Sequence, residues 1–397
     1  MTKSIYPLTE SVLEKVDLNA AIKVINSKKI TMGKKTIEIE EYFKKNIVKT
    51  NPLMVNSGSS ANLLIFQCLI NPLVKKLKIG DEVLIPAICW STSLWPIIQS
   101  GLKVKFVDID NNSLNIDLED LQKKITKKTK ALMLVHALGN CTDMDKLVKI
   151  CKRNKLILIE DTCEALGSTF KKKALGTFGD FASFSFYYSH HITSGEGGMI
   201  CVKDKKYLNI IKSLRSHGWS RDLSNKKLIS KKYKNIDKNW IFINSGFNLR
   251  PTDINAAIGI QQLKRLKKIL SIRKYNFHKI KNSLIENKNY KKQFTILNDQ
   301  KFANIAWFGI PFVLNSKNKS YKLKVMDKLN RKGIMTRPII SGNFAKQPSI
   351  RLYKIKNNTK LPNADLIDKN AFFLGLHNIK ITDSKLKFLT KCIYSSL

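Results

Sequence analysis

Short apolar runs alternate with amphipathic stretches between residues 50 and 205, and this alternation is the feature that most limits the fold. One of the stretches, Asp143–Arg153, has helical spacing of its apolar side chains. Strands that alternate with helices predict a mostly parallel sheet covered on both faces, which is an α/β fold. The apolar runs have the length of strands, and they span Glu82–Pro86, Lys103–Ile109, Ala131–Ala137, Leu156–Glu160 and Phe181–Phe186.

The rest of the chain is organised differently. Residues 206–245 are polar, rich in lysine and irregular. We expect them to form a long excursion over the surface, and such excursions in compact domains tend to be functional. After Pro251 a helical pattern runs towards Tyr275, and the residues beyond it indicate a smaller α+β domain. We therefore expect two domains, residues 1–255 with the N-terminal segment and residues 256–397.

The net charge is +41, from 71 Lys and Arg against 30 Asp and Glu. Such an excess suits nucleic-acid binding, because basic patches neutralise phosphates. The lysines, however, occur in nearly every segment rather than in one stripe, and no signature of a nucleic-acid-binding module is present. A compositional bias on solvated faces explains the charge better, so we expect no nucleic-acid partner.

Cysteine content and apolar runs indicate the compartment. The seven cysteines are an odd number without a CxxC pair, which favours reduced thiols over a disulfide framework or a zinc site. No run approaches the roughly 18 apolar residues of a membrane helix, and the N-terminus lacks the apolar core of a signal peptide. We expect a cytoplasmic protein without a membrane partner.

Two small clusters precede the most informative part of the sequence. Residues 56–62 (NSGSSAN) form a small-residue turn before a helix start, where Gly58, Ser59 and Ser60 could surround a phosphate with help from the helix dipole. In isolation an ordinary N-capped turn explains this cluster better. Trp90 follows a strand at the edge where open α/β sheets place ligands, and it could stack on a flat ring. By itself, a core tryptophan is the better explanation.

Two later clusters contain acids and histidines. Asp161 ends an apolar strand, where a carboxylate can hold a protonated pyridine nitrogen. A helix N-cap explains Asp161 equally well. Glu164 lies three residues further on. The fourth cluster, residues 185–198 (SFYYSHHITSGEGG), is the most specific, and it contains Ser185 and His190.

The four clusters, in this order and spacing, resemble the fold-type I pyridoxal-phosphate enzymes that act on nucleotide-linked ketosugars: the sugar aminotransferases and their 3-dehydratase relatives. The resemblance runs from residues 31–33 (TMG) to residues 373–377 (FLGLH). It implies an aspartate aminotransferase-like fold, with a mostly parallel central sheet flanked by helices and a smaller α+β C-terminal domain. It also implies pyridoxal phosphate or pyridoxamine phosphate as cofactor, bound by Gly58, Ser59, Ser60, Trp90, Asp161, Glu164 and Ser185.

His190 occupies the position where the aminotransferases carry the lysine that bonds to the cofactor. Imidazole has no primary amine and cannot form that bond. In the dehydratase branch histidine takes this position, and the YSHH run is particularly similar to the enzymes that act on GDP-4-keto-6-deoxymannose. A second histidine-bearing branch holds an iron–sulfur cluster with cysteines in the following excursion. Residues 204–260 contain no cysteine, so we expect no iron–sulfur cluster.

Two further segments, HGWSRD and GFNLRPTD, resemble parts that this family offers to the active site, partly across a dimer interface. The resemblance implies a homodimer with shared sites, in which Asn248 contacts the cofactor phosphate of the neighbouring subunit. Arg221 and Arg250 would bind glutamate carboxylates or substrate phosphates, with surface solvation as the alternative. His217 is a second proton-transfer or positioning candidate, with a structural role equally plausible. Two matching residues have no assigned role, Arg337 and Asn343.

The expected activity is a pyridoxamine-phosphate-dependent nucleotide-sugar 3-dehydratase. Glutamate would convert the cofactor to its amine form, and His190 would act as base and then acid while the hydroxyl at carbon 3 of a 4-keto-6-deoxy sugar leaves. GDP-4-keto-6-deoxymannose is the preferred substrate and a CDP-linked sugar the next. The alternatives are a sugar 4-aminotransferase, which would need a lysine such as one of residues 171–173, and a noncatalytic ligand-binding relative. The histidines lack metal-ligand spacing, so no metal is expected.

Overall fold

The computed structural model describes residues 4–10, 13–316, 318, 320–355 and 359–397. A seven-stranded sheet of order β1-β9-β8-β5-β4-β2-β3 forms the larger part of the molecule. Within it, β2, β3, β4, β5 and β8 pair in parallel, and β9 is antiparallel to both of its neighbours. The predicted mostly parallel sheet is confirmed. Its strands are β1 (Asn51–Val55), β2 (Glu82–Pro86), β3 (Lys103–Val107), β4 (Thr129–Val135), β5 (Ile157–Asp161), β8 (Phe181–Ser185) and β9 (Gly198–Val202).

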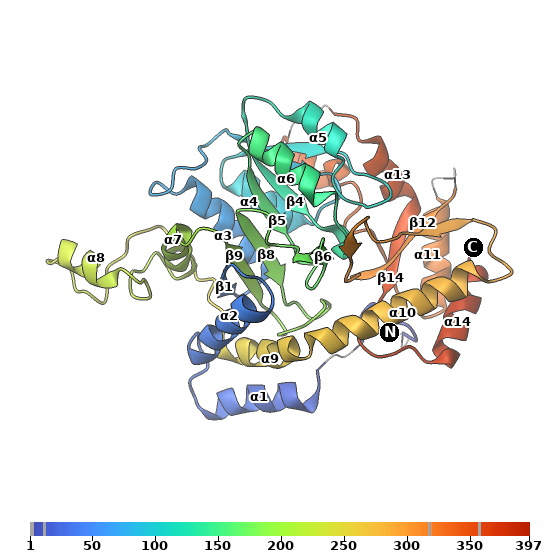
Figure 1. Cartoon of the computed structure of the whole chain (residues 1–397), viewed down its shortest axis with the longest axis horizontal. Coiled ribbons are helices and arrows are strands. Elements are labelled where there is room, and N and C mark those ends of the chain that lie inside the picture. The colour runs from blue at the N-terminus through green and yellow to red at the C-terminus, as the bar shows by residue number, and fades with distance from the viewer. Residues whose placement is uncertain (1–3, 11–12, 317, 319, 356–358) are drawn as a thin grey trace.

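Both faces of this sheet are covered. Along β4 the consecutive side chains of Leu132, Met133 and Leu134 are all inaccessible to solvent. Successive strand residues point to opposite faces, so helices must cover each of them. This double burial is why the strands appear in the sequence as continuous apolar runs. The connecting helices are α3 (Gly58–Ile70), α4 (Ser91–Gln99), α5 (Leu118–Lys124), α6 (Met144–Arg153) and α7 (Lys206–Arg215) (Figure 1).

The smaller part is α+β. Its antiparallel sheet has the order β10-β12-β14-β13, from β10 (Phe294–Ile296), β12 (Gly309–Leu314), β13 (Thr336–Pro338) and β14 (Ala371–Gly375). Its helices are α10 (Leu266–Ile285), α11 (Tyr321–Arg331), α12 (Pro348–Leu352), α13 (Pro362–Asn370) and α14 (Asp383–Tyr394). A third sheet combines β11 (Ala303–Asn304) with β6 (Thr169–Phe170) and β7 (Lys173–Ala174), and so joins the two parts.

The helical pattern after Pro251 is confirmed but was underestimated in length. It forms α9 (Asp253–Lys264) and then α10, with the chain breaking at Arg265. α10 runs from the large sheet to the small one (Figure 1). The domain boundary near residue 255 remains a prediction.

The N-terminal residues contact both parts of the molecule. Tyr6 forms an isolated bridge with Ile334, and its hydroxyl donates to the carbonyl of Gly375 at 2.9 Å. The helices α1 (Lys15–Asn26) and α2 (Lys34–Asn46) then pack against α9.

The prediction of an irregular excursion over residues 206–245 is partly wrong. Its first part forms α7, in which Tyr207, Ile211 and Leu214 are buried. Lysines between these apolar positions concealed the helical spacing. The remainder projects from the body with α8 (Lys226–Lys232), a helix without a buried residue (Figure 1).

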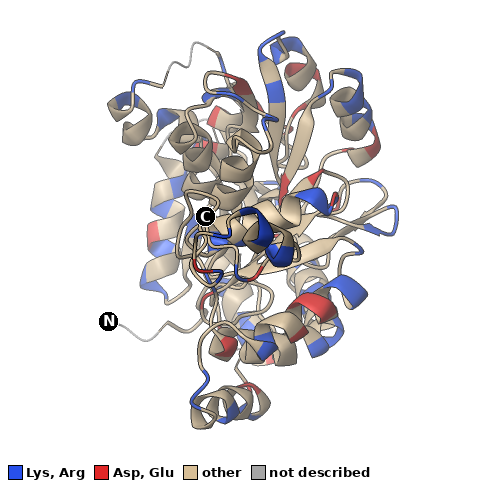
Figure 2. Ribbon diagram, turned by 90° about the vertical axis from the view of Figure 1, so that its left-hand side faces the viewer, with Lys and Arg blue, Asp and Glu red and all other residues tan. Residues whose placement is uncertain are grey.

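The charged residues are distributed over the surface as the lysine-rich sequence predicts. Lys and Arg are spread over many helices and loops rather than gathered on one element (Figure 2). Among the described helices, none is long and apolar enough to cross a membrane.

Candidate active site

A cavity of about 340 Å³ lies at the carboxyl ends of β4, β5 and β8. This is the edge of an α/β sheet where ligands bind, and the volume is within the range of small-molecule sites. Arg337 of β13 and Phe308 also line the cavity, so both parts of the molecule contribute to it. The structure brings seven predicted site residues together here, Gly58, Ser59, Trp90, Asp161, Glu164, Ser185 and His190.

Asp161 lies at the end of β5 and is held by three donors. One carboxylate oxygen accepts from Asn62 Nδ2 at 2.9 Å and from Ser93 Oγ at 2.7 Å, and the other accepts from the backbone N–H of Cys163 at 3.1 Å. These contacts suit an ionised carboxylate. Asp161 precedes a turn rather than a helix, so the helix-cap alternative is excluded.

The N-terminus of α3 forms another wall. Ser57 caps the helix, its Oγ accepting from the N–H of Ser60 at 3.1 Å. A Cβ on Gly58 would lie 2.8 Å from Ser185 Cβ and 2.9 Å from Cys163 Sγ, so only glycine lets the helix begin this close to β8. Ser60 serves the cap and does not line the cavity, and its predicted phosphate contact stays a prediction.

His190 follows β8 and faces the cavity. Its backbone N–H donates to the carbonyl of Tyr187 at 3.0 Å. Burial lowers the pKa of His190 to about 4, with a raising influence of Asp161 and a lowering one of Arg273. The imidazole is therefore neutral near pH 7 and can accept a proton.

Glu164 is a second titratable group of the cavity. Its Oε2 accepts from the backbone N–H of Leu138 at 2.8 Å. Burial raises the pKa of Glu164 to about 7; the Leu138 hydrogen bond and Arg337 act against this rise, and Asp161 adds to it. Near neutral pH this carboxyl group exists in both protonation states.

His136 and Phe308 are among the cavity residues that the sequence reasoning did not assign to the site. His136 follows β4, and its Nε2 lies 3.0 Å from Oε2 of the fully buried Glu160. A polar residue after an apolar strand is the same signal that led to Asp161, so His136 could have been found. Phe308 belongs to the smaller part of the molecule, and no local signal marks it.

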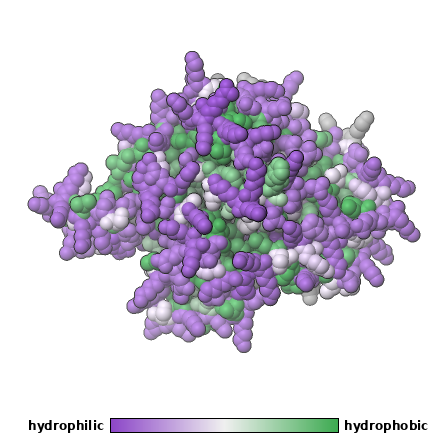
Figure 3. Space-filling view, viewed as in Figure 1, coloured by the Kyte–Doolittle hydropathy of each residue, from purple (hydrophilic) through white to green (hydrophobic). Residues whose placement is uncertain are grey.

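Four predicted site residues do not line this cavity, His217, Arg221, Asn248 and Arg250. Asn248 is exposed and accepts from Arg250 Nε at 3.0 Å, and the Arg221 guanidinium lies 4.0 Å from the ring centre of Trp219. Along the chain, His217 and Arg221 precede α8 of the projecting segment, and Asn248 and Arg250 follow that segment. The segment carries hydrophobic atoms among hydrophilic ones in Figure 3. The roles of these four residues stay predictions. Asn343 does not line the cavity either, and its amide donates to Asp365 at 2.6 Å.

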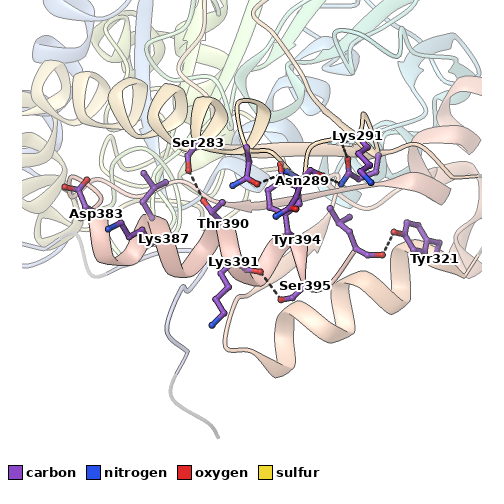
Figure 4. A pocket seen from close by; sticks show the side chains of 14 residues that line it. Ser283, Asn289, Lys291, Tyr321, Asp383, Lys387, Thr390, Lys391, Tyr394 and Ser395 are labelled. Carbon is purple, nitrogen blue, oxygen red and sulfur yellow. Dashed lines mark hydrogen bonds between the residues drawn. The ribbon is translucent and has the colours of Figure 1, made fainter.

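A more open cavity of about 1180 Å³ lies between α10 and α14 (Figure 4). It is lined by residues from 283 to 397 and contains no predicted site residue. Its side chains are largely engaged with one another or with the backbone, as in the contact between Ser283 and Thr390 at 2.9 Å.

The sequence profile of the DegT/DnrJ/EryC1/StrS aminotransferase family matches residues 12–391. The chain belongs to this family. One relative is GDP-4-keto-6-deoxy-D-mannose 3-dehydratase of Escherichia coli O55:H7, 38% identical over 383 residues, which are 95% of this chain and 97% of that protein.

Solved structures place the DegT/DnrJ/EryC1/StrS member in the same fold. The E. coli GDP-4-keto-6-deoxy-D-mannose-3-dehydratase with bound hydrated PLP matches with a TM-score of 0.91 and 36% identity, covering 98% of this chain and 100% of that one. A GDP-4-keto-6-deoxymannose-3-dehydratase with a trapped PLP-glutamate geminal diamine gives 0.90 and 36%, with the same coverage. The predicted family and the aspartate aminotransferase-like α/β fold are confirmed.

Proposed function

We propose that this family member is a pyridoxamine-phosphate-dependent 3-dehydratase of a GDP-linked 4-keto-6-deoxy sugar, with glutamate as amino donor. One observation carries the proposal. His190 faces the cavity at the motif position of the aminotransferase lysine, and no lysine is found among the described residues that line the cavity. The similarity to a GDP-4-keto-6-deoxy-D-mannose 3-dehydratase over nearly the whole chain supports the choice of nucleotide and sugar.

The residues of the cavity fit pyridoxal phosphate. The N-terminus of α3 suits a phosphate, and Ser59 and Ser185 lie in the same cavity. The absence of a side chain at Gly58 lets this helix end lie close to β8. Asp161, fixed by three donors, suits a protonated ring nitrogen, and the half-exposed Trp90 suits a ring face. When bound, the cofactor supplies an electron-withdrawing ring and, after taking an amino group from glutamate, an amine that condenses with the sugar ketone.

His190 is the proton carrier of the proposed reaction. As a neutral imidazole it takes up a proton on a ring nitrogen, and it then donates that proton to the oxygen leaving carbon 3 of the sugar. Three apolar side chains line the same cavity, those of Phe308, Ile340 and Phe373. They limit the access of water to the imidazole of His190. Without a lysine among the described residues that line it, the cavity offers no primary amine with which to recapture the cofactor, so hydrolysis by water releases the keto sugar and ammonia.

The rival assignments are less well supported. The three lysines of residues 171–173 lie exposed at the β6–β7 turn, and Lys171 pairs with Asp145 at 2.5 Å. They do not line the cavity, so they do not supply the amine that an aminotransferase needs there. A noncatalytic relative would need neither the three donors on Asp161 nor a neutral base beside it.

We also propose a cytoplasmic homodimer with shared active sites. Asn248, His217 and Arg221 are exposed and lie outside the cavity of their own chain, where a second copy can use them. Trp240 and Phe242 nearby are 59% and 54% exposed, an apolar area that a partner subunit would cover.

The carrying observation can be tested on the cofactor alone. Pyridoxal phosphate and then glutamate are added to the protein while the cofactor absorbance is recorded, and a separate sample is reduced with borohydride before mass analysis of the chain. We expect conversion to the amine form by glutamate and no covalently attached cofactor. Attachment to a lysine would revive the aminotransferase, and an unchanged spectrum with glutamate would favour a binding protein.

A further inference from the structure

The imidazole of His190 is held by aromatic rings rather than by a hydrogen bond. Its Nδ1 is buried and has no hydrogen-bond partner within the described part of the chain. The ring of Phe308 meets it edge-on, with centroids 5.2 Å apart and planes at 71°, and Tyr187 does so from 6.0 Å at 89°. Catalytic histidines are usually oriented by a carboxylate or carbonyl on their second nitrogen.

Phe308 is itself fixed from two sides. Its backbone N–H donates to the carbonyl of Leu138 at 2.9 Å, beside the cavity. Its carbonyl accepts from the buried guanidinium of Arg273 at 2.8 Å, and Arg273 also donates to the carbonyl of Trp307. The ring lies 5.9 Å from that of His191 as well, so it packs on both histidines. A rigid backbone therefore places this ring against His190.

We propose that Phe308, contributed by the smaller part of the molecule, is a positioning residue that orients the imidazole of His190 and keeps water from it. The proposal rests on the proposed function, in which His190 moves the proton. Edge-to-face ring pairs have preferred geometry, and an imidazole held in this way needs no protein acceptor on Nδ1 to keep its orientation. One ring nitrogen is then free for the proton that the reaction moves.

The charged surroundings of His190 are limited. Asp161 faces it from β5, Arg273 from α10 and His191 along the chain. The other titratable groups that line the cavity are Tyr187, His136, Cys163, Glu164, Glu196 and Arg337. Loss of the Phe308 ring leaves these groups in place and admits water to the imidazole. Hydration favours the charged form, so the pKa of His190 would rise from about 4 towards its ordinary value near 6.5.

The test compares Phe308→Leu with the matched control Phe312→Leu in the full-length protein loaded with pyridoxal phosphate. Phe312 is buried in β12 and stacks on Phe372 at 5.3 Å, so its replacement disturbs the same sheet. The titration of His190 is followed by NMR, with His190→Asn for assignment. We expect the pKa of His190 to rise by about one unit or more in Phe308→Leu and to stay unchanged in Phe312→Leu and Phe308→Tyr.

Turnover of the keto sugar gives the second readout. We expect kcat to fall about tenfold or more in Phe308→Leu, because a base displaced by a fraction of an ångström loses alignment, with KM within about twofold and recovery in Phe308→Tyr. An unchanged titration in Phe308→Leu, or an equal shift in Phe312→Leu, would overturn the proposal. Should Phe308→Leu not fold, Phe308→Met is measured instead. If the wild-type protein dehydrates no sugar, the proposed function is refuted. The titration of His190 in Phe308→Leu still tests whether the Phe308 ring keeps water from the imidazole.

Discussion

Two adjacent histidines have different tasks because their surroundings differ. His190 faces the cavity, whereas His191 is fully buried and its Nε2 lies 2.8 Å from the carbonyl oxygen of Ala306. The carbonyl can only accept, so Nε2 of His191 carries the proton of a neutral ring. Burial, aided by Arg273, holds the pKa of His191 well below its ordinary value. His191 thus anchors the motif to the carbonyl of Ala306, whereas proton transfer is the role that we propose for His190.

This assignment predicts a pH dependence of stability. A histidine with a lowered pKa binds fewer protons in the folded state than in the unfolded chain, so its stabilising effect is lost as the pH falls below about 6.5. In His191→Gln that group is absent while the amide can still donate to Ala306. The gap in free energy of unfolding between wild type and His191→Gln should therefore narrow from pH 7 to 5, by up to about 1.4 kcal/mol per unit. Urea unfolding measures it, and a constant gap would contradict the assignment.

At the scale of the elements, Asp253 joins α9 to α2. Its carboxylate accepts from the backbone N–H groups of Gly33, Lys35 and Thr36 and from the Thr36 hydroxyl, at 2.8 to 3.0 Å. A buried acid at the first turn of another helix satisfies donors that have no partner within that helix. This contact fixes the helix pair at the edge of the sheet.

Replacement of Asp253 should therefore lower the free energy of unfolding more than replacement of an ordinary helix cap does. Asp253→Ala removes the acceptor of four donors, of which the two of Thr36 are buried, and we expect the free energy of unfolding to fall by about 3 kcal/mol. Asp117→Ala removes a partly exposed cap of α5, which accepts from Glu119 and Asp120, and should cost about 1 kcal/mol. The midpoints of urea unfolding give both values. Equal losses would show that Asp253 is only a local cap.

The sequence predicted the elements whose signal is local. Strands β2 and β5 were placed within one residue, because burial on both faces makes them continuous apolar runs. Helix α7 was missed, since its lysines masked the spacing. Phe308 was missed for another reason: its position depends on Arg273 and Leu138, which are distant in sequence. Asp161 was found because it ends an apolar strand, whereas His190 was found through the resemblance of its motif to the lysine motif of the sugar aminotransferases.

For the whole molecule, the central question is which chain completes each active site. If Asn248 serves the neighbouring subunit, a dimer of one His190→Asn chain and one Asn248→Ala chain contains one intact site and one doubly altered site. Coexpression of the two inactive variants should then restore about a quarter of wild-type activity, because half of the dimers are mixed and each has one working site. No restoration would place Asn248 in the site of its own chain or outside the mechanism.

The most direct test of the account is the mass of the sugar product. The protein is mixed with pyridoxal phosphate, glutamate and GDP-4-keto-6-deoxymannose, and the products are analysed by mass spectrometry together with an ammonia assay, with His190→Asn as the control. We predict a sugar one oxygen atom lighter than the substrate, formed with ammonia and absent with His190→Asn. A product in which an amine has replaced the ketone would contradict the account, because it would require a lysine, and none is present among the described residues that line the cavity.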